Sequence, residues 1–410
     1  MTKFNRIILL VAIAMLSLGA TARGTEKLPN LFNSVDQLAM DHWVDSVFNS
    51  LSPEARIGQL IVAAVTPKSN DATRELVQRL VSKNMVGGLI YEGSTMAEQA
   101  EVTNLAQSLA TVPLMITIDG EWGLGMRLKE VPNYPRNLIL GAIDDDILLY
   151  EYGREVARQC RRMGIQVNFA PVLDVNDNPL NPVIGNRSFG ESPELVARHA
   201  IAFARGLEDG GVMAVGKHFP GHGSSYEDSH KTLPVINKTM QEINTCELVP
   251  FRRFIEAGLS GILTAHLLVP SIDGGKAPTS LSSGCVTNVL RDQLNFNGLI
   301  FTDALNMKGA TQLLKGSACV NALLAGNDVL LMPENVGDEI NAIKDAIASG
   351  KLSQSTIDER CKKILRYKYA LDLTSRQHVN TANMLNEVNS QHAGVLKRQL
   401  IGSSITVIKN

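Results

Sequence analysis

A regular alternation of short apolar runs with longer segments of helical periodicity begins near residue 58 and most narrowly constrains the fold. The apolar runs lie at 60–65, 88–91, 114–118, 167–171, 212–216, 261–265, 299–302 and 329–332. Helical patterns lie between them at 72–81, 96–110, 145–163, 193–209, 240–257 and 310–324. Strands that are apolar along nearly their whole length are typical of a parallel sheet that helices cover. We therefore predict an α/β protein.

The number of predicted strands, eight, is the number that closes a (β/α)8 barrel, a fold of ~250 residues. We predict such a TIM-type barrel over residues 30–372, with a basic amphipathic helix at 355–369 near its end. An open, doubly wound parallel sheet is the alternative. The remainder, 373–410, is polar until residue 402, where a strand-like alternation begins. We expect that end to be unpaired within its own chain or weakly ordered.

The first 22 residues have the pattern of a secretory signal peptide. Lys3 and Arg6 precede the apolar run 7–18, and Ala20-Thr21-Ala22 offers a small-x-small cleavage site. The apolar run is short for a membrane span. There is no cysteine near the cleavage site, so a lipid anchor is not expected. We therefore expect export, either to the periplasm or out of the cell.

Composition argues against several kinds of partner. The 410-residue chain is 44% hydrophobic and 20% charged, as in ordinary globular proteins. The chain after residue 22 contains 37 Lys and Arg residues and 41 Asp and Glu residues, which gives a net charge of about −4. Neither nucleic acid nor an anionic membrane is therefore favoured. The five cysteines lack Cys-x-x-Cys spacing and are interpreted as small core residues rather than as a disulfide framework.

Polar residues follow the predicted strands directly, at the end where a (β/α)8 barrel builds its site. In strand order they are Asp119, Asp174, Lys217, His218, His266 and Asp303. A carboxylate in the position of Asp303 is a nucleophile, a metal ligand or the N-cap of the next helix. Lys217 and His218 offer donors for the hydroxyl or carbonyl oxygens of a ligand.

The segment 215–230 carries a further pair, Asp228 and His230, among glycines. A carboxylate that bonds an imidazole keeps one tautomer and suits a general acid/base near neutral pH, whereas the alternative is a solvated loop pair. Zinc ligation by histidines of this region is a weaker interpretation. Pro220 and Gly221 prevent a helix from presenting His218 and His222 on one face. No metal is predicted.

Two more regions contribute candidate ligand-binding residues. Asp119 can accept hydrogen bonds from sugar hydroxyls, and Arg127 lies eight residues further on. Trp122 stacks on a sugar ring or fills the core, and packing is the favoured interpretation. Arg187 either binds a ligand or satisfies the carbonyls of its own loop.

These residues lie in motifs that together resemble glycoside hydrolase family 3, in its β-N-acetylglucosaminidase branch. The motifs, in chain order, are Asp119-Gly-Glu-x-Gly, Asn168-Phe-Ala-Pro-Val-Leu-Asp-Val, Ile184-Gly-Asn-Arg-Ser-Phe-Gly, Lys217-His-Phe-Pro-Gly-His-Gly, Asp228-Ser-His, Thr264-Ala-His and Thr302-Asp-Ala-Leu-x-Met. They span roughly residues 50–370. Trp122 departs from the pattern, since many members of the branch have glycine there.

The resemblance implies a (β/α)8 barrel and retaining hydrolysis of terminal β-linked N-acetylglucosamine. By position, Asp303 resembles the nucleophile, His230 the acid/base and Asp228 its orienting partner. The groups that hold the sugar hydroxyls correspond to Asp119, Arg127, Arg187, Lys217 and His218. The carboxylate supplies the covalent chemistry, so no metal or organic cofactor is expected. Larger relatives continue into an α/β sandwich, and residues 373–410 are interpreted as a linker and the truncated start of that domain.

The predicted function is that of an exported exo-β-N-acetylglucosaminidase. Its substrates are peptidoglycan fragments or chitin-derived oligosaccharides that end in β-GlcNAc. A β-glucosidase or β-xylosidase of the same family is one alternative, although those generally lack the Asp-x-His pair. A truncated chain that binds sugar, or is inert, is the other. Because a neutral imidazole repels an incoming anion less than a carboxylate does, phosphorolysis beside hydrolysis stays open, as does the oligomeric state.

Overall fold

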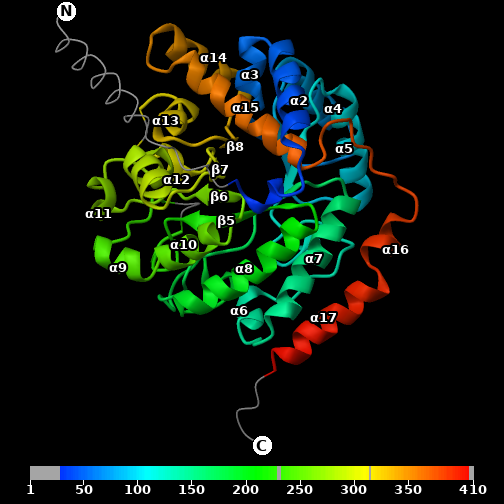
Figure 1. Ribbon diagram of the computed structural model, residues 1–410, viewed down its shortest axis with the longest axis vertical. Helices are drawn as coiled ribbons and strands as arrows, with labels where there is room; N and C mark the ends of the chain where they lie inside the picture. Colours follow the sequence, from blue (N-terminus) through cyan, green and yellow to red (C-terminus); the bar gives the residue numbers. More distant parts are fainter. Residues whose placement is uncertain (1–27, 229–231, 314, 406–410) are drawn as a thin grey trace, which may run out of the picture.

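The computed structural model describes residues 28–228, 232–313 and 315–405, and a barrel of parallel strands stands at its centre (Figure 1). The strands are β1 (Ile61–Val65), β2 (Gly88–Tyr91), β3 (Met115–Ile118), β4 (Val167–Asn168), β5 (Met213–Phe219), β6 (Gly261–Thr264), β7 (Leu299–Thr302) and β8 (Leu330–Leu331). Every strand lies within or across one of the eight predicted runs. Nearly all of their residues are buried, as expected for strands with the barrel interior on one side and helices on the other.

The strand order β7-β6-β5-β4-β3-β2-β1-β8 and the parallel pairing of all neighbours confirm the (β/α)8 class. A parallel bridge between Phe301 and Val329 joins β7 to the chain just before β8. This bridge closes the ring, and the open doubly wound sheet is therefore wrong. β5 is longer than predicted, so Lys217 and His218 lie within the strand rather than after it.

Helices surround the barrel. Those that connect or follow successive strands are α4 (Asp71–Gln78), α5 (Met96–Leu109), α7 (Asp146–Arg162), α8 (Pro193–Asp209), α9 (Met240–Thr245), α10 (Leu248–Glu256), α12 (Lys308–Thr311), α13 (Ala318–Ala325), α14 (Val336–Ala348) and α15 (Gln354–Ala370). Between β6 and β7 the chain forms a short helix α11 (Pro270–Asp273) and a π-helix at Gly284–Gln293. At the amino-terminal side, α2 (Gln37–Ser50) and α3 (Pro53–Gln59) precede β1.

Local sequence signals explain where the well-predicted helices start. Ser192 caps α8 by accepting from the amide of Leu195, and Pro193 occupies the first helical position, where its missing N–H costs nothing. Thr95 and Glu98 form a reciprocal capping box at α5. Two predictions of continuous helices are wrong. The pattern at 240–257 breaks into α9 and α10, and the pattern at 310–324 contains the separate helices α12 and α13.

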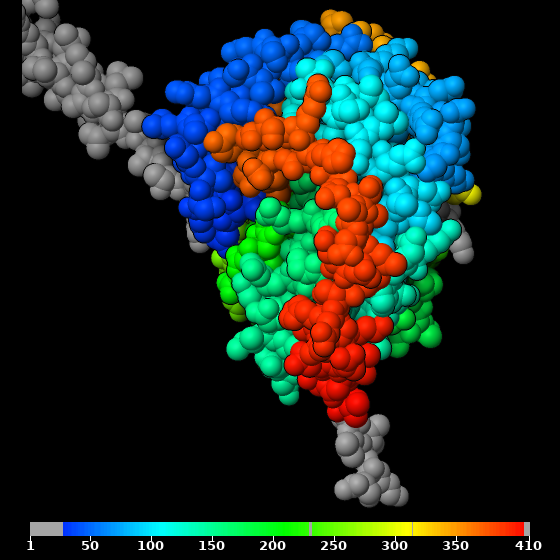
Figure 2. Space-filling model, turned by 90° about the vertical axis from the view of Figure 1, so that its right-hand side faces the viewer, coloured from blue at the N-terminus to red at the C-terminus, as the bar shows by residue number. Residues whose placement is uncertain are grey.

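The carboxyl-terminal segment packs along the outside of the barrel (Figure 2). It contains α16 (Met384–Val388) and α17 (Gln391–Ser403), and both contact α7. Arg158 of α7 donates to the carbonyl of Val388, and Leu396 and Leu400 are buried. The predicted strand beginning at 402 is wrong at its start, because residues 402 and 403 end α17. Its last residues, 406–410, lie outside the described part.

The predicted signal peptide at 1–22 also lies outside the described residues. Within residues 28–228, 232–313 and 315–405, no helix is long and apolar enough to cross a membrane. All five cysteines carry free thiols, and four of them are buried, which agrees with their interpretation as core residues.

Candidate active site

The carboxyl ends of β3 to β7 bring six of the eight predicted site residues to one mouth of the barrel. Asp119 follows β3, Lys217 and His218 lie near the end of β5, and Asp303 follows β7. Arg127 comes from the loop after β3, and Arg187 from the loop after β4. Direct bonds join most of these groups into one network, which the following paragraphs build outward from Asp119.

Asp119 lies between two cations. Its Oδ1 accepts from the Lys217 ammonium at 2.8 Å, and its Oδ2 accepts from the Arg127 guanidinium at 2.7 Å. Burial by itself would raise the pKa of the Asp119 carboxyl, but the charges of Lys217 and Arg127 outweigh it and hold that pKa below its usual range. Asp119 is therefore ionised at neutral pH and is a fixed acceptor at the mouth.

Glu121 is the residue of the mouth that sequence reasoning missed. Its side chain is 0% exposed, and it accepts two hydrogen bonds from Arg187, at 2.7 and 2.9 Å. It also lies 2.8 Å from the Lys217 ammonium. Burial opposes its ionisation, but Lys217 and Arg187 lower its pKa far below the usual range. The signal was its position two residues after Asp119, inside the same motif.

Arg187 contacts both Glu121 and His218. Arg187 bonds the carbonyl of Val183 in its own loop at 3.3 Å, as one of its two interpretations predicts, and it also lies 3.2 Å from His218 Nε2. The Arg187 guanidinium thus contacts one ring nitrogen of His218. Nδ1 in turn donates to Asp174 Oδ2 at 2.6 Å.

Asp174 is a second anchor that had no assigned role. Beyond His218, its Oδ1 accepts from the amide of His222 at 2.7 Å. Burial would raise the pKa of Asp174, but the adjacent His218 outweighs it and lowers that pKa. Burial, followed by the neighbouring His218, lowers the pKa of His222 to about 4. His222 is therefore neutral at pH 7, and it belongs to the turn that follows β5.

Asp303 is half-buried at the end of β7, and one carboxylate oxygen accepts from the amide of Ala304 at 2.8 Å. The N-cap interpretation is wrong, because α12 starts five residues later with Met307 as its cap residue and no side-chain capping bond. Burial would raise the pKa of Asp303, but the neighbouring His266 and His218 outweigh it and lower that pKa. An ionised carboxylate at this position is available for chemistry.

The Asp228–His230 pair is only partly described. Asp228 is half-buried, and its carbonyl accepts from the amide of Thr232 at 2.9 Å. His230 lies outside the described residues. The base of this loop is fixed, because Asn181 donates to the carbonyls of His222 and Gly223 at 2.8 Å each.

Metal ligation finds little support among the described residues. The His218 imidazole bonds the Asp174 carboxylate, and the main-chain amide of His222 bonds the other oxygen of the same carboxylate. The one described group close enough to hold an ion is Asp177, Cys246 and Glu247. The Lys238 ammonium bonds both of its carboxylates, so a cation of the chain already occupies the group.

Trp122 stands at the side of the mouth. The Arg136 guanidinium lies 3.5 Å from the centre of its ring, within the range of a cation–π contact. The indole is half-buried, so it is neither a pure core residue nor a free stacking platform.

Comparisons with known proteins agree with the barrel fold. Residues 53–367 match the model of the glycosyl hydrolase family 3 N-terminal domain. A protein named β-hexosaminidase A from Pseudoalteromonas piscicida is 31% identical over 368 residues, which cover 82% of this chain and 61% of that protein. The chain thus spans about six tenths of the length of that relative.

Two solved structures are similar as well. A glycoside hydrolase family 3 β-N-acetylglucosaminidase from Paenibacillus sp. is 34% identical, with a TM-score of 0.80 over 87% of this chain and 69% of that one. A β-glucoside phosphorylase is 26% identical, with a TM-score of 0.86 over 94% of this chain and 70% of that one. The family model covers well over half of the sequence, and the chain belongs to glycoside hydrolase family 3.

Proposed function

We propose that this protein is a retaining exo-β-N-acetylglucosaminidase. The observation that carries the proposal is the ionised, half-buried carboxylate of Asp303 in a barrel mouth lined by polar groups on neighbouring strands. A retaining glycosidase needs such a carboxylate as its nucleophile. The names of two similar proteins, β-hexosaminidase A and a family 3 β-N-acetylglucosaminidase, support the choice of sugar.

In the proposed mechanism, a carboxylate oxygen of Asp303 attacks the anomeric carbon and the bond to the leaving oxygen breaks. His230 gives its proton to that oxygen, and Asp228 orients the imidazole. His230 then takes a proton from water, which displaces Asp303 and releases the sugar with retained configuration. Asp119, Lys217 and Arg187 hold the sugar hydroxyls in this scheme, with Arg127 and His218 beside them.

The network of ion pairs and hydrogen bonds around Glu121 supports these assigned roles. Asp119 and Lys217 are held in place by 2.7–2.8 Å contacts before any substrate enters. A preorganised site loses little conformational entropy on binding, which favours the transition state. We also propose export, on the basis of the predicted signal peptide, and substrates that are peptidoglycan fragments or chito-oligosaccharides.

The sugar specificity is tested with p-nitrophenyl glycosides. The β-GlcNAc glycoside is expected to have a kcat/KM about 100-fold or more above that of the β-glucoside, since a site built for the acetamido group rejects an analogue without it. Preference for the glucoside would overturn the proposal in favour of a β-glucosidase. No turnover of either, from folded protein, would favour an inert or merely sugar-binding chain.

The phosphorylase among the similar structures makes phosphorolysis the second candidate. The same assay in phosphate buffer separates it from hydrolysis, because the released sugar is then the 1-phosphate rather than the free sugar. Quantifying both products by chromatography gives the ratio directly.

Replacing His230 by alanine is expected to slow poor leaving groups far more than activated ones. Loss of a general acid costs about 10²–10⁴ in rate when the leaving oxygen needs a proton. Chitobiose is therefore expected to lose that factor, whereas 2,4-dinitrophenyl β-GlcNAc loses less than about tenfold in the glycosylation step. His392→Ala, an exposed histidine of α17, is the matched control. Equal slowing of both substrates would argue against the acid role.

A further inference from the structure

We propose a second binding site, for a small multiply charged oxyanion, in a cavity at the opposite end of the barrel from the active site. The cavity measures about 1090 Å³ and four arginines line it, Arg154, Arg158, Arg161 and Arg205. We call it the arginine cavity. The proposal does not depend on the glycosidase activity, since no residue of the barrel mouth contributes to it.

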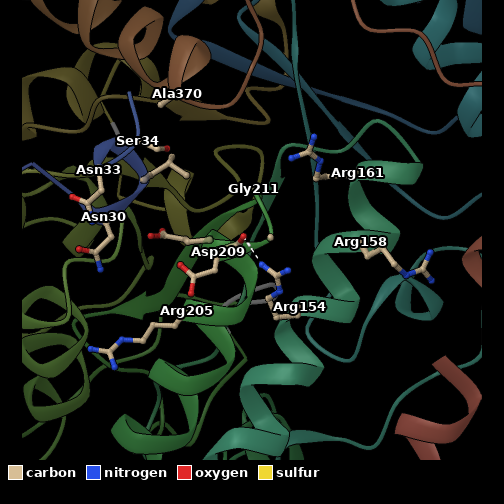
Figure 3. Close-up of a pocket in the computed structure, with 13 residues that line it drawn as sticks. Asn30, Asn33, Ser34, Arg154, Arg158, Arg161, Arg205, Asp209, Gly211 and Ala370 are labelled. Atoms are coloured by element: carbon tan, nitrogen blue, oxygen red, sulfur yellow. Dashed lines mark hydrogen bonds between the residues drawn. The ribbon is translucent and has the colours of Figure 1, made fainter. Parts of the chain in front are cut away.

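The arginine cavity lies where the strands begin. Its lining includes Gly210 and Gly211, which lie in the turn before β5, and Glu208, which accepts from the amide of Ser260 just before β6. α7 and α8 pack against each other and form one side, and the chain around Asn30 to Ser34 forms the opposite side (Figure 3). The active-site groups all lie at the other ends of the strands, so the two sites are separate.

The sequence spacing aims the arginines at this cavity. Arg154, Arg158 and Arg161 are four and three residues apart on α7, so they share one face of the helix. Arg205 comes from the neighbouring α8. Two helices thus place four arginines around one concave surface, although the Arg158 guanidinium turns toward Glu155 and the carbonyls of Glu387 and Val388.

The four arginines differ in the hydrogen bonds and ion pairs that their guanidinium groups form with the rest of the chain. Arg154 donates to the carbonyl of Asp209 at 2.6 Å, and Arg158 pairs with Glu155 at 2.7 Å. Arg161 and Arg205 form no ion pair with any residue in the described part of the chain. Their guanidinium groups are therefore open to an external anion.

Gly211 keeps room for one of them. A Cβ at this position would come within 2.5 Å of Arg161 Nη1, so any larger residue would displace the guanidinium. The residue also has a φ of +79°, a backbone conformation that favours glycine. The absence of a side chain at Gly211 thus lets the Arg161 guanidinium lie close against the backbone.

The charge balance of the arginine cavity is positive. Two carboxyl groups line it beside the four guanidinium groups, those of Glu208 and Asp209. Burial raises the pKa of Glu208 to about 8, so this group is mostly neutral at pH 7. Asp209 accepts from the Tyr150 hydroxyl at 2.9 Å and remains the one anion. Because Glu155 neutralises Arg158, the charges of Arg154, Arg161 and Arg205 stand against that of Asp209. Two net positive charges in a concave site suit a ligand with two or more negative charges.

Guanidinium geometry narrows the ligand class. The planar fork of arginine donates two parallel hydrogen bonds to phosphate or carboxylate oxygens. Phosphate monoesters and polycarboxylates share this chemistry. The two sources are distinguished by using inorganic phosphate and citrate as separate probes.

The test is calorimetric titration of the full chain at pH 7, with each probe at constant ionic strength. Arg161→Ala/Arg205→Ala is expected to raise the dissociation constant at least about tenfold, because each removed fork loses charge-assisted hydrogen bonds. Arg198→Ala, on α8 but outside the arginine cavity, is the matched control and is expected to bind like the unaltered protein. Hydrolysis of the β-GlcNAc glycoside is expected to be unchanged in all three proteins, which separates this site from the barrel mouth.

The double variant Arg161→Lys/Arg205→Lys keeps both positive charges. It keeps the test usable if the alanine variant does not fold. It is expected to bind more weakly than the unaltered protein, because the forks are lost. Tighter binding of phosphate than of citrate assigns the site to phosphate esters, and the reverse assigns it to polycarboxylates. Absence of saturation by either probe up to about 20 mM would overturn the proposal. Equal affinity in the unaltered and doubly substituted proteins would overturn it as well.

Discussion

Asp303→Ala is expected to lower kcat for β-GlcNAc glycosides by about four orders of magnitude or more, because it removes the proposed covalent nucleophile. The carboxylate is ionised by its surroundings, since its neighbours His266 and His218 hold its pKa down despite burial. No other described carboxylate in the mouth is free for this role: Asp119 and Glu121 are engaged with cations. The measurement is steady-state hydrolysis of the p-nitrophenyl substrate.

Two controls make this result interpretable. Asp292→Ala changes an exposed aspartate of the π-helix and is expected to keep full activity. Urea unfolding of Asp303→Ala is expected to show a free energy of unfolding within about 1 kcal/mol of the unaltered protein, because one hydrogen bond to a neighbouring amide is lost. A residual rate within tenfold of the unaltered protein, from a folded variant, would remove Asp303 from the mechanism.

Glu121→Ala is expected to reduce both stability and activity. Its carboxylate is fully buried and lies between Arg187 and Lys217, and removing it takes an anionic partner from the half-buried Arg187 and the buried Lys217. Breaking a buried ion pair from one side costs about 3–5 kcal/mol of unfolding free energy. Arg187 also loses its orientation toward His218, so kcat/KM is expected to fall by about 100-fold. Urea unfolding and steady-state kinetics measure the two effects separately.

The isosteric change Glu121→Gln separates charge from packing. It keeps the shape and one acceptor oxygen, so a smaller loss of stability is expected than for alanine. Glu101→Gln is the matched surface control, because Glu101 is 44% exposed and pairs with Arg74. Exposed pairs contribute about 0–1 kcal/mol. If Glu121→Ala were no more destabilising than Glu101→Gln, the network at the barrel mouth would contribute little to the stability of the protein.

The predicted strands agree closely with the structure because a buried parallel strand has a signal that needs no partner. Each is a short apolar run bounded by turn or polar residues, and tertiary packing only adjusts its ends. β5 is the informative exception. It continues through Lys217 and His218, since ion pairs with Asp119 and Glu121 satisfy a buried lysine that sequence patterns treat as a strand end.

Helices were less predictable than strands. The pattern at 240–257 is amphipathic throughout, yet the chain turns at Cys246 and Glu247, and Glu247 there meets Lys238 and Ser224. The packing of α16 and α17 on α7 was also missed. Its hydrogen bonds run from arginine side chains to carbonyls more than two hundred residues away, which no local pattern reports.

The sequence by itself determined the number and order of the strands and the end of the barrel where chemistry-bearing residues gather. It did so because hydrophobic periodicity and strand-following polar residues are local properties of the chain. Only the tertiary structure decided which of those residues touch. Glu121 and Asp174 became anchors of the mouth because the barrel brings β3, β4 and β5 side by side. In a buried site the protonation and role of each group depend on the charges within a few ångströms, and those distances exist only after folding.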